Sequence, residues 1–292
     1  MNMRTGIQQI MIGSLCTSVA KAAQCLRQIA EIGYEGIELN RFMIHPTPWM
    51  VRLLTKLAGM PTGKGGSFNW KKLIQESGLK VLSLHVDLGS LERELDQIAD
   101  EAKSFGTDTV VITGMYRFDY SSAEAVADLA MRMNKVGEAL SEKGIHLLYH
   151  NHNVEWVKLA NGLTAFDFLV TSLDERYVNF EFDSFWPSEA GVDVYRVAQK
   201  LGKRMKKWHI CDRGNREKGP FMTPILASDC LELGTGNMNL DLLWQIATEN
   251  GVEDVVLETH RNFIHKSPME SIRLSYSYLR KKKEEKRWIL GH

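Results

Sequence analysis

The segment from His146 to Trp156, HLLYHNHNVEW, changes abruptly from apolar residues to groups that can bind metals or move protons. Its second half brings together histidines, asparagines and a glutamate: His150, Asn151, His152, Asn153 and Glu155. Imidazole and carboxylate groups serve as metal ligands and as general acids or bases near neutral pH. The segment therefore indicates a chemical site at the end of a buried strand.

Polar residues of the same kinds end the other apolar runs of the chain. They are Glu38 and Asn40, His85 and Asp87, His150 and His152, Glu181 and Asp183, His209, and Glu258 and His260. Alternate residues of a strand share a face, so His150 with His152, Glu181 with Asp183, and Glu258 with His260 are each expected to point to one side. Isolated charges inside a barrel cost several kcal/mol, so these groups are expected to pair with each other, form hydrogen bonds or bind a cation. Taken singly, a buried histidine is more often an ordinary core residue, and a strand-end acid often caps a helix.

The convergence of several strand ends favours a metal site. Asp183, His209 and Glu258 end three consecutive predicted strands, and His150 ends the strand before them. Two carboxylates and two imidazoles suit Mn²⁺, Co²⁺ or Zn²⁺, and suit Ca²⁺ less well. We therefore expect one divalent metal ion held by these four residues.

Short apolar runs alternate with longer helical ones along the whole chain, which is the pattern of a parallel sheet covered by helices. The expected strands are Ile7–Gly13, Tyr34–Asn40, Lys80–Asp87, Thr107–Gly114, the run that opens at His146, Tyr177–Asp183, Met205–Asp212 and Glu253–His260. Strands recur about every 35 residues, which predicts an α/β fold: a (β/α)₈ TIM barrel that forms a single domain over residues 1–292. An open doubly wound sheet is the alternative, but no GxGxxG follows the first strand.

Two connections are long for such a barrel, Arg41 to Ser67 and Arg213 to Met238. Both follow strand carboxyl ends, where barrel active sites lie, so they are candidate walls or lids. Trp49, Phe68 and Trp70 could form an apolar wall facing a substrate, although ordinary packing is the more frequent role for such residues.

The composition excludes several classes of function. Thirty-six basic and thirty-six acidic residues leave no net charge, whereas nucleic-acid binders carry a basic surplus. No apolar run of about twenty residues could span a membrane, and the N-terminus lacks the features of a secretion signal. The four cysteines, Cys16, Cys25, Cys211 and Cys230, form no CxxC pair and are expected to be reduced thiols. We therefore expect a cytoplasmic protein with no nucleic-acid or membrane partner.

The motifs, taken in order, resemble those of the xylose isomerase-like TIM barrel superfamily of sugar phosphate isomerases and epimerases, which includes inosose dehydratase-like proteins. The matching segments are YHNHNVEW, FEFDSFWPSEAGVD, WHICD, LGTGNMNLDLL and VVLETH. The resemblance covers nearly the whole chain. It implies a TIM barrel, a divalent metal at the strand carboxyl ends, and a sugar or polyol substrate of carbohydrate metabolism.

Transferred position by position, the resemblance makes Asp183, His209 and Glu258 metal ligands, with Glu38, His85 and the segment Lys207–Asp212 nearby. The fifth strand departs from the family pattern, because His150 stands where many members have a glutamate. Cys211 replaces the lysine of the family's HxKD motif. The fourth ligand is then either His150 or Glu155, and His150 is favoured because a strand end is more rigid than a loop.

Such a site would bind a carbonyl oxygen and an adjacent hydroxyl, and would stabilise the enediolate formed when the α-proton leaves. We expect His152 to be the base, assisted by Glu258, with Glu155, His85 and His260 as candidate acids. Alternatively, His152 and Glu155 only fix the tautomer of His150. The expected substrate-binding residues are Glu38, Asn40, His85, Trp186 and His260.

These residues predict a metal-dependent sugar isomerase or epimerase, with a dehydratase of a keto sugar or inosose as the alternative. The missing fifth-strand glutamate favours 1,2-isomerisation or dehydration over 3-epimerisation. An abasic-site (AP) endonuclease-like hydrolase is disfavoured by the zero net charge. A non-catalytic binding subunit would show no exchange of a substrate α-proton. The aromatic segments SFNW and RWIL make a homo-oligomer a further expectation.

Overall fold

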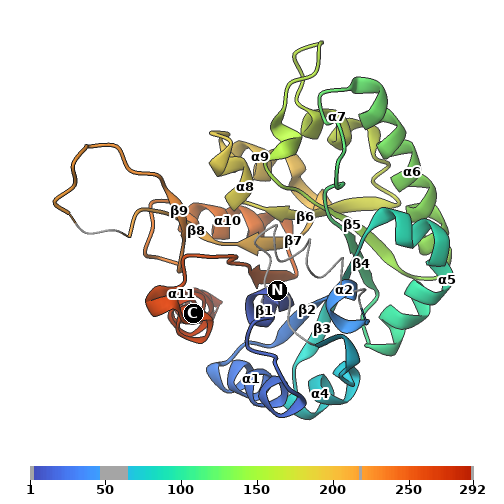
Figure 1. Cartoon of the computed structure of the whole chain (residues 1–292). Coiled ribbons are helices and arrows are strands. Elements are labelled where there is room, and N and C mark those ends of the chain that lie inside the picture. The colour runs from blue at the N-terminus through green and yellow to red at the C-terminus, as the bar shows by residue number, and fades with distance from the viewer. Residues whose placement is uncertain (1–2, 47–64, 217–218, 291–292) are drawn as a thin grey trace.

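A computed structural model describes residues 3–46, 65–216 and 219–290. Eight parallel strands close into a barrel in the order β1, β10, β7, β6, β5, β4, β3, β2 (Figure 1). Their bounds are β1 Arg4–Gln8, β2 Gly36–Asn40, β3 Lys80–Val86, β4 Thr109–Ile112, β5 His146–His150, β6 Val178–Asp183, β7 Met205–Ile210 and β10 Asp254–Leu257. The predicted (β/α)₈ barrel is confirmed.

Helices surround the barrel and connect its strands (Figure 1). They are α1 Val19–Ile32, α2 Arg41–Ile44, α4 Trp70–Ser77, α5 Leu88–Ser104, α6 Ala123–Glu142, α7 Ala165–Ser172, α8 Phe185–Glu189, α9 Val194–Leu201, α10 Leu240–Asn250 and α11 Pro268–Leu290. Several begin at a side chain that accepts from a backbone N–H; Asp87, for example, accepts from the N–H of Ser90 at 2.8 Å. Within the described part of the chain, no helix combines the length and apolarity needed to cross a membrane.

The first strand lies earlier than the sequence pattern predicts. Instead of Ile7–Gly13, the strand is Arg4–Gln8, and Gln9–Ile12 form a 3₁₀ helix. The Gln8 side chain accepts from the N–H of Ile10 and starts this turn. The predicted bounds of the first strand were therefore wrong. A short apolar run fits either a strand or a 3₁₀ helix, and the sequence pattern does not distinguish the two.

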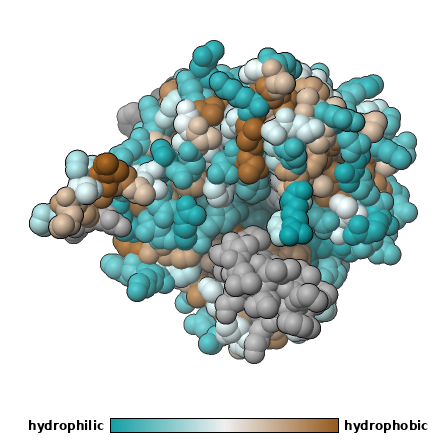
Figure 2. Space-filling model, turned by 45° about the horizontal axis from the view of Figure 1, so that its top comes forward, coloured by the Kyte–Doolittle hydropathy of each residue, from teal (hydrophilic) through white to brown (hydrophobic). Residues whose placement is uncertain are grey.

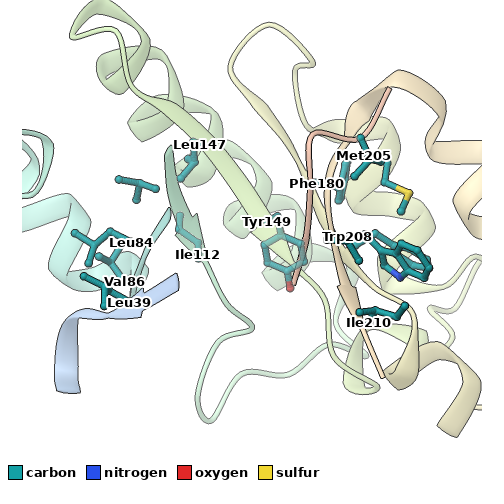
Figure 3. Packing of buried hydrophobic residues seen from close by; sticks show 14 of the residues in the cluster. Leu39, Leu84, Val86, Ile112, Leu147, Tyr149, Phe180, Met205, Trp208 and Ile210 are labelled. Atoms are coloured by element: carbon teal, nitrogen blue, oxygen red, sulfur yellow. The ribbon is translucent and has the colours of Figure 1, made fainter. Parts of the chain in front are cut away.

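On each barrel strand, one set of alternate residues packs outward against the helices and belongs to the main hydrophobic core. Figure 3 shows labelled examples from β2 to β7, including Leu39, Tyr149 and Trp208. The intervening residues of these strands include Glu38, His150 and His209, which therefore face the barrel interior. The core between sheet and helices is apolar, while part of the barrel interior is polar.

The long connections contain structure of their own. The second includes an antiparallel hairpin, β8 (Asp212–Gly214) with β9 (Asp229–Leu231). Residues 219–228, between these strands, protrude from the molecule and include exposed apolar residues (Figure 2), among them Met222 and Ile225. Of the three aromatic residues considered for an apolar wall, Trp49 lies outside the described residues, whereas Trp70 is buried and Phe68 packs against the core. Packing therefore accounts for Phe68 and Trp70.

Candidate active site

The carboxyl ends of β5, β6, β7 and β10 bring four ligand-type side chains together. We call them the rim group: His150, Asp183, His209 and Glu258. One ligand atom from each lies within 4.8 Å of all the others, and all four side chains are buried. The parallel register explains the clustering, because Asp183 lies beside His209, and Val256, two residues before Glu258, also lies beside His209.

Asp183 is held in place by contacts with its side chain and with its main chain. Its Oδ1 accepts from the N–H groups of Phe185 at 2.7 Å and Trp186 at 3.3 Å. The Asn151 side chain bridges the strands, donating to the Asp183 carbonyl at 2.9 Å and accepting from its N–H at 3.1 Å. Oδ2 remains directed towards His150, 4.0 Å from its Nε2. Asn151 was not among the predicted site residues, although it follows a predicted ligand directly.

His209 has a different partner on each ring nitrogen. Its Nδ1 lies 2.7 Å from Oε2 of Glu258, and its Nε2 lies 2.5 Å from Oε2 of Glu38. Burial alone would lower the pKa of His209, but Glu181, Glu38 and Glu258 raise it well above its ordinary value. The imidazole therefore connects the rim to a layer of carboxylates further inside the barrel.

The rim group fits a divalent cation. Ligands about 2.0–2.2 Å from a common ion lie roughly 3–4 Å from one another. His150 Nε2 is 3.8 Å from Oε2 of Glu258 and 4.0 Å from Oδ2 of Asp183. Burial and the neighbouring Glu258 raise the pKa of Asp183 well above its usual range, because two adjacent carboxylates repel. A cation between them would remove that repulsion.

Three rings lie beside the rim group and remain partly exposed: His152, Trp186 and His260. The Trp186 ring is 5.6 Å from each of the two imidazoles, centroid to centroid, and His152 is 4.9 Å from His150. Burial, followed by the charge of His150, lowers the pKa of His152 to about 3. The structure thus brings these three predicted residues to the barrel mouth.

Glu155 lies elsewhere, behind β5. Its Oε1 accepts from the hydroxyl of Tyr149 at 2.7 Å, and its Oε2 accepts from the backbone N–H of His152 at 3.0 Å. Burial raises the pKa of this carboxyl to about 7, against the effect of the Tyr149 hydrogen bond. Because both oxygens are engaged, Glu155 fixes the loop after β5, and His150 is the fifth-strand residue of the rim group.

The remaining predicted site residues are buried below the mouth. His85 Nε2 lies 3.2 Å from Oε2 of Glu38 and 3.1 Å from Oε2 of Glu181. Burial would lower the pKa of His85, but Glu181 and Glu38 raise it to about 9. Asn40 donates to Oε1 of Gln8 at 2.8 Å and belongs to the β1–β2 junction.

Apart from His209, the polar residues of the segment Lys207–Asp212 make structural contacts. Lys207 pairs with Asp254 inside the barrel. The Cys211 thiol is buried and contacts the carbonyl of Leu231. Asp212 Oδ2 accepts from the N–H groups of Gly234 and Gly236 and so holds the LGTG turn. The four cysteines are free and buried.

The chain resembles known proteins along most of its length. A family model described as xylose isomerase-like TIM barrel matches residues 26–282. Among curated relatives, the inosose dehydratase of Clostridium botulinum (strain Alaska E43 / Type E3) is 22% identical over 275 residues, which cover 89% of each chain. That of Clostridium perfringens (strain 13 / Type A) is 23% identical over 275 residues, with the same coverage.

Solved structures share the fold. A sugar phosphate isomerase/epimerase from Parabacteroides distasonis ATCC 8503 matches with a TM-score of 0.73 at 18% identity, covering 96% of this chain and 94% of that one. The IOLI protein, solved with a bound zinc atom, matches with a TM-score of 0.63 at 16% identity, covering 94% and 96%.

Proposed function

Because the chain belongs to the xylose isomerase-like TIM barrel family, we propose that it is a divalent-metal-dependent enzyme that removes the α-proton of a keto sugar or keto-polyol. One observation carries this proposal: the rim group provides two carboxylates and two imidazoles, directly beside the partly exposed rings of His152, Trp186 and His260. Ligands and proton carriers thus share one barrel mouth.

The rim group would hold Mn²⁺, Co²⁺ or Zn²⁺. When bound, such an ion would act as a Lewis acid, stabilising the negative charge that develops on a substrate carbonyl oxygen when the neighbouring C–H bond breaks. The zinc atom bound in the IOLI structure supports a metal ion of this class.

His152 is the proposed proton acceptor. Its low pKa, about 3, keeps the imidazole unprotonated at neutral pH, as a base requires. Its backbone N–H donates to Glu155 at 3.0 Å, which fixes the loop that carries the ring. A weak base suffices where the acidity of the substrate proton is raised by neighbouring positive charge.

His260 is the proposed proton donor, on the other side of Trp186. Its Nε2 lies 3.6 Å from Oε1 of Glu258, and this carboxylate can orient the ring. With an acceptor and a donor on separate strands, the site suits dehydration. The α C–H proton passes to His152, a C=C bond forms, and the β-hydroxyl leaves as water with a proton from His260. The curated inosose dehydratases support this outcome.

Isomerisation or epimerisation is the second candidate. The same two imidazoles could return the proton to a different atom or to the opposite face of the carbon. The fold shared with a sugar phosphate isomerase/epimerase is consistent with it. Both candidates begin with the same step, so a first test addresses α-proton removal.

The test uses metal-loaded protein in deuterated water with a panel of ketoses and inososes, followed by nuclear magnetic resonance. We expect deuterium at the α-carbon, with loss of water if the enzyme is a dehydratase. His152→Gln should keep the metal and slow exchange at least about 100-fold. His146→Gln, at the exposed start of β5, is the matched control and should exchange normally.

Retained exchange in His152→Gln would remove this residue from the base role. No exchange by fully metal-loaded protein with any member of the panel would favour the non-catalytic binding subunit. Salt-dependent retention of DNA would favour the endonuclease-like alternative.

A further inference from the structure

A second set of ligand-type side chains lies one layer further inside the barrel than the rim group. We call it the inner group: Glu38, His85, Glu181 and His209, from β2, β3, β6 and β7. One ligand atom of each lies within 4.8 Å of all the others, and all four side chains are buried. Only His209 belongs to both groups.

Three of the four carboxylate–imidazole distances within the inner group are close to those of a tetrahedral metal site. Zinc bonds of about 2.0–2.1 Å place neighbouring donor atoms roughly 3.3 Å apart. The Nε2 atom of His85 is 3.2 Å from Glu38 Oε2 and 3.1 Å from Glu181 Oε2. The Nε2 atom of His209 is 3.2 Å from Glu181 Oε2, and only its 2.5 Å approach to Glu38 is shorter.

Glu181 is surrounded by imidazoles but makes no well-formed side-chain hydrogen bond to the described residues. Its Oε2 lies within 3.3 Å of nitrogens on three imidazoles, those of His85, His150 and His209. Yet within the described part of the chain neither oxygen of Glu181, nor Oε1 of Glu38, has a hydrogen-bond partner. Buried carboxylate oxygens without a hydrogen bond cost free energy even beside imidazoles, and a cation at the centre of the group would offset that cost.

The backbone is irregular at the positions of both carboxylates. The register of β2 with β3 shifts between Ile37 and Glu38, and that of β6 with β7 shifts between Phe180 and Glu181. Irregularities of this kind, such as β-bulges, redirect side chains and are common near functional sites. Here both shifts occur at the carboxylates of the inner group.

We propose that the inner group binds a second divalent cation, of the Zn²⁺ or Co²⁺ class, in a closed four-ligand site. With every position taken by protein, this ion meets no substrate and has a structural role, linking β2 and β3 to β6 and β7 across the barrel. His209 would contribute Nε2 to this ion and Nδ1 to the rim ion. With both nitrogens bound to metal its ring would be an imidazolate, and the ring protons would be released to water as the two ions bind. The inference does not rest on the proposed reaction.

Metal content of zinc-loaded, gel-filtered protein tests the proposal. We expect two ions per wild-type chain and one per chain in Glu181→Gln, which keeps the rim ion. Asp183→Asn should also keep one ion, because it loses only the rim site. Glu155→Gln, a substitution of another buried glutamate outside both groups, is the control and should bind two.

One ion in wild type and still one in Glu181→Gln would overturn the proposal, because Glu38 and Glu181 would then only orient imidazoles through hydrogen bonds. Two ions in both would also overturn it, because the second ion would lie elsewhere. If Glu181→Gln does not fold, anomalous diffraction from zinc-loaded wild-type crystals decides. It should give two peaks about 6 Å apart, one bond of about 2 Å on each side of the His209 ring. A single peak at the rim contradicts the second site.

Discussion

The proposed metal ligands are oriented by neighbours that never touch the ion themselves. Asn151 fixes the main chain of Asp183 through two hydrogen bonds across the β5–β6 pair. Backbone N–H groups of α8 hold one oxygen of Asp183, so only the other is free to bind. Mutation of such supporting residues commonly lowers the affinity of a site for its metal ion.

Asn151→Ala should lower metal affinity by about 10- to 100-fold without removing a ligand, because Asp183 loses its alignment. Isothermal titration with Zn²⁺ or Mn²⁺ measures the affinity. Asn153→Ala is the control, since Asn153 is exposed and provides no side-chain cap to the 3₁₀ helix that follows it. Equal affinities in the two variants would show that the Asn151 bridge does not orient Asp183.

The raised pKa of Glu155 predicts that the stability of the folded protein depends on pH. Its pKa is about 7 in the folded protein, against 4.5 for the same carboxyl in the unfolded chain. Folding therefore favours the protonated carboxyl. The unfavourable contribution is absent below the unfolded pKa, grows as the pH rises from 4.5 to 7, and is complete above 7. It amounts to roughly 3 kcal/mol.

Glu155→Gln should therefore gain stability relative to wild type over this pH range. Its amide oxygen can still accept from the N–H of His152, and its NH2 group can donate to the Tyr149 hydroxyl, whose oxygen also accepts. Urea unfolding of both proteins at about pH 5, 6, 7 and 8 would measure the difference between their free energies of unfolding. A difference in unfolding free energy that stays constant with pH would contradict the assignment.

At the scale of single elements, strand alternation separates two environments. Apolar residues such as Leu39 and Trp208 pack in the core between strands and helices, and the residues beside them, Glu38 and His209, turn inward. The turns that follow the strands are held by polar side chains. Asp212, after β7, binds the turn at Gly234 and Gly236. These turns shape the barrel mouth.

Gly236→Ala should destabilise the protein by about 1–3 kcal/mol, because an added Cβ would lie 2.4 Å from Oδ1 of Asp212 and 2.6 Å from the carbonyl oxygen of Arg213. Gly89→Ala in α5 is the matched control, since its Cβ would meet only the flexible end of Arg93 at 3.1 Å and Asp87 at 3.4 Å. Urea unfolding compares the two variants. Equal unfolding midpoints would show that the turn accommodates the added Cβ without loss of stability.

At the scale of the whole molecule, the barrel closes where β10 pairs with β1 on one side and β7 on the other. Asp254 lies at this closure and binds Arg4 at 2.6 Å and Lys207. Lys207 is 4% exposed, so it depends on this partner. The closure thus rests on a buried ion pair as well as on backbone hydrogen bonds.

Asp254→Asn should cost about 3–5 kcal/mol, because the ammonium group of Lys207 would stay buried without a counter-charge. Arg4→Gln is the control: the Arg4 side chain is 42% exposed, and its loss should cost about 0–1 kcal/mol. Chemical denaturation measures both. A similar small loss in each variant would mean that Lys207 finds water or another partner.

Oligomeric assembly and cytoplasmic location remain predictions from the sequence. Sedimentation of the metal-loaded protein would measure the assembly directly.

The sequence by itself determined the (β/α)₈ fold and the strand ends at which His150, Asp183, His209 and Glu258 lie. Both follow from local regularities: apolar runs with a constant repeat define the strands, and in a parallel barrel every strand ends at the same rim. Local regularity could not place the first strand, because Ile7–Ile12 suits a strand or a 3₁₀ turn equally well.

Only the tertiary structure decided which partner each polar group has. It placed Glu155 against Tyr149 instead of in the rim group, and it brought Glu181 beside His85 and His209. These contacts join strands that are distant in the chain. The register also shifts within the β2–β3 and β6–β7 pairs, and no single strand encodes that shift. The local sequence thus indicates which residues are candidate ligands. Which of them contact one another depends on how the strands come together in the closed barrel.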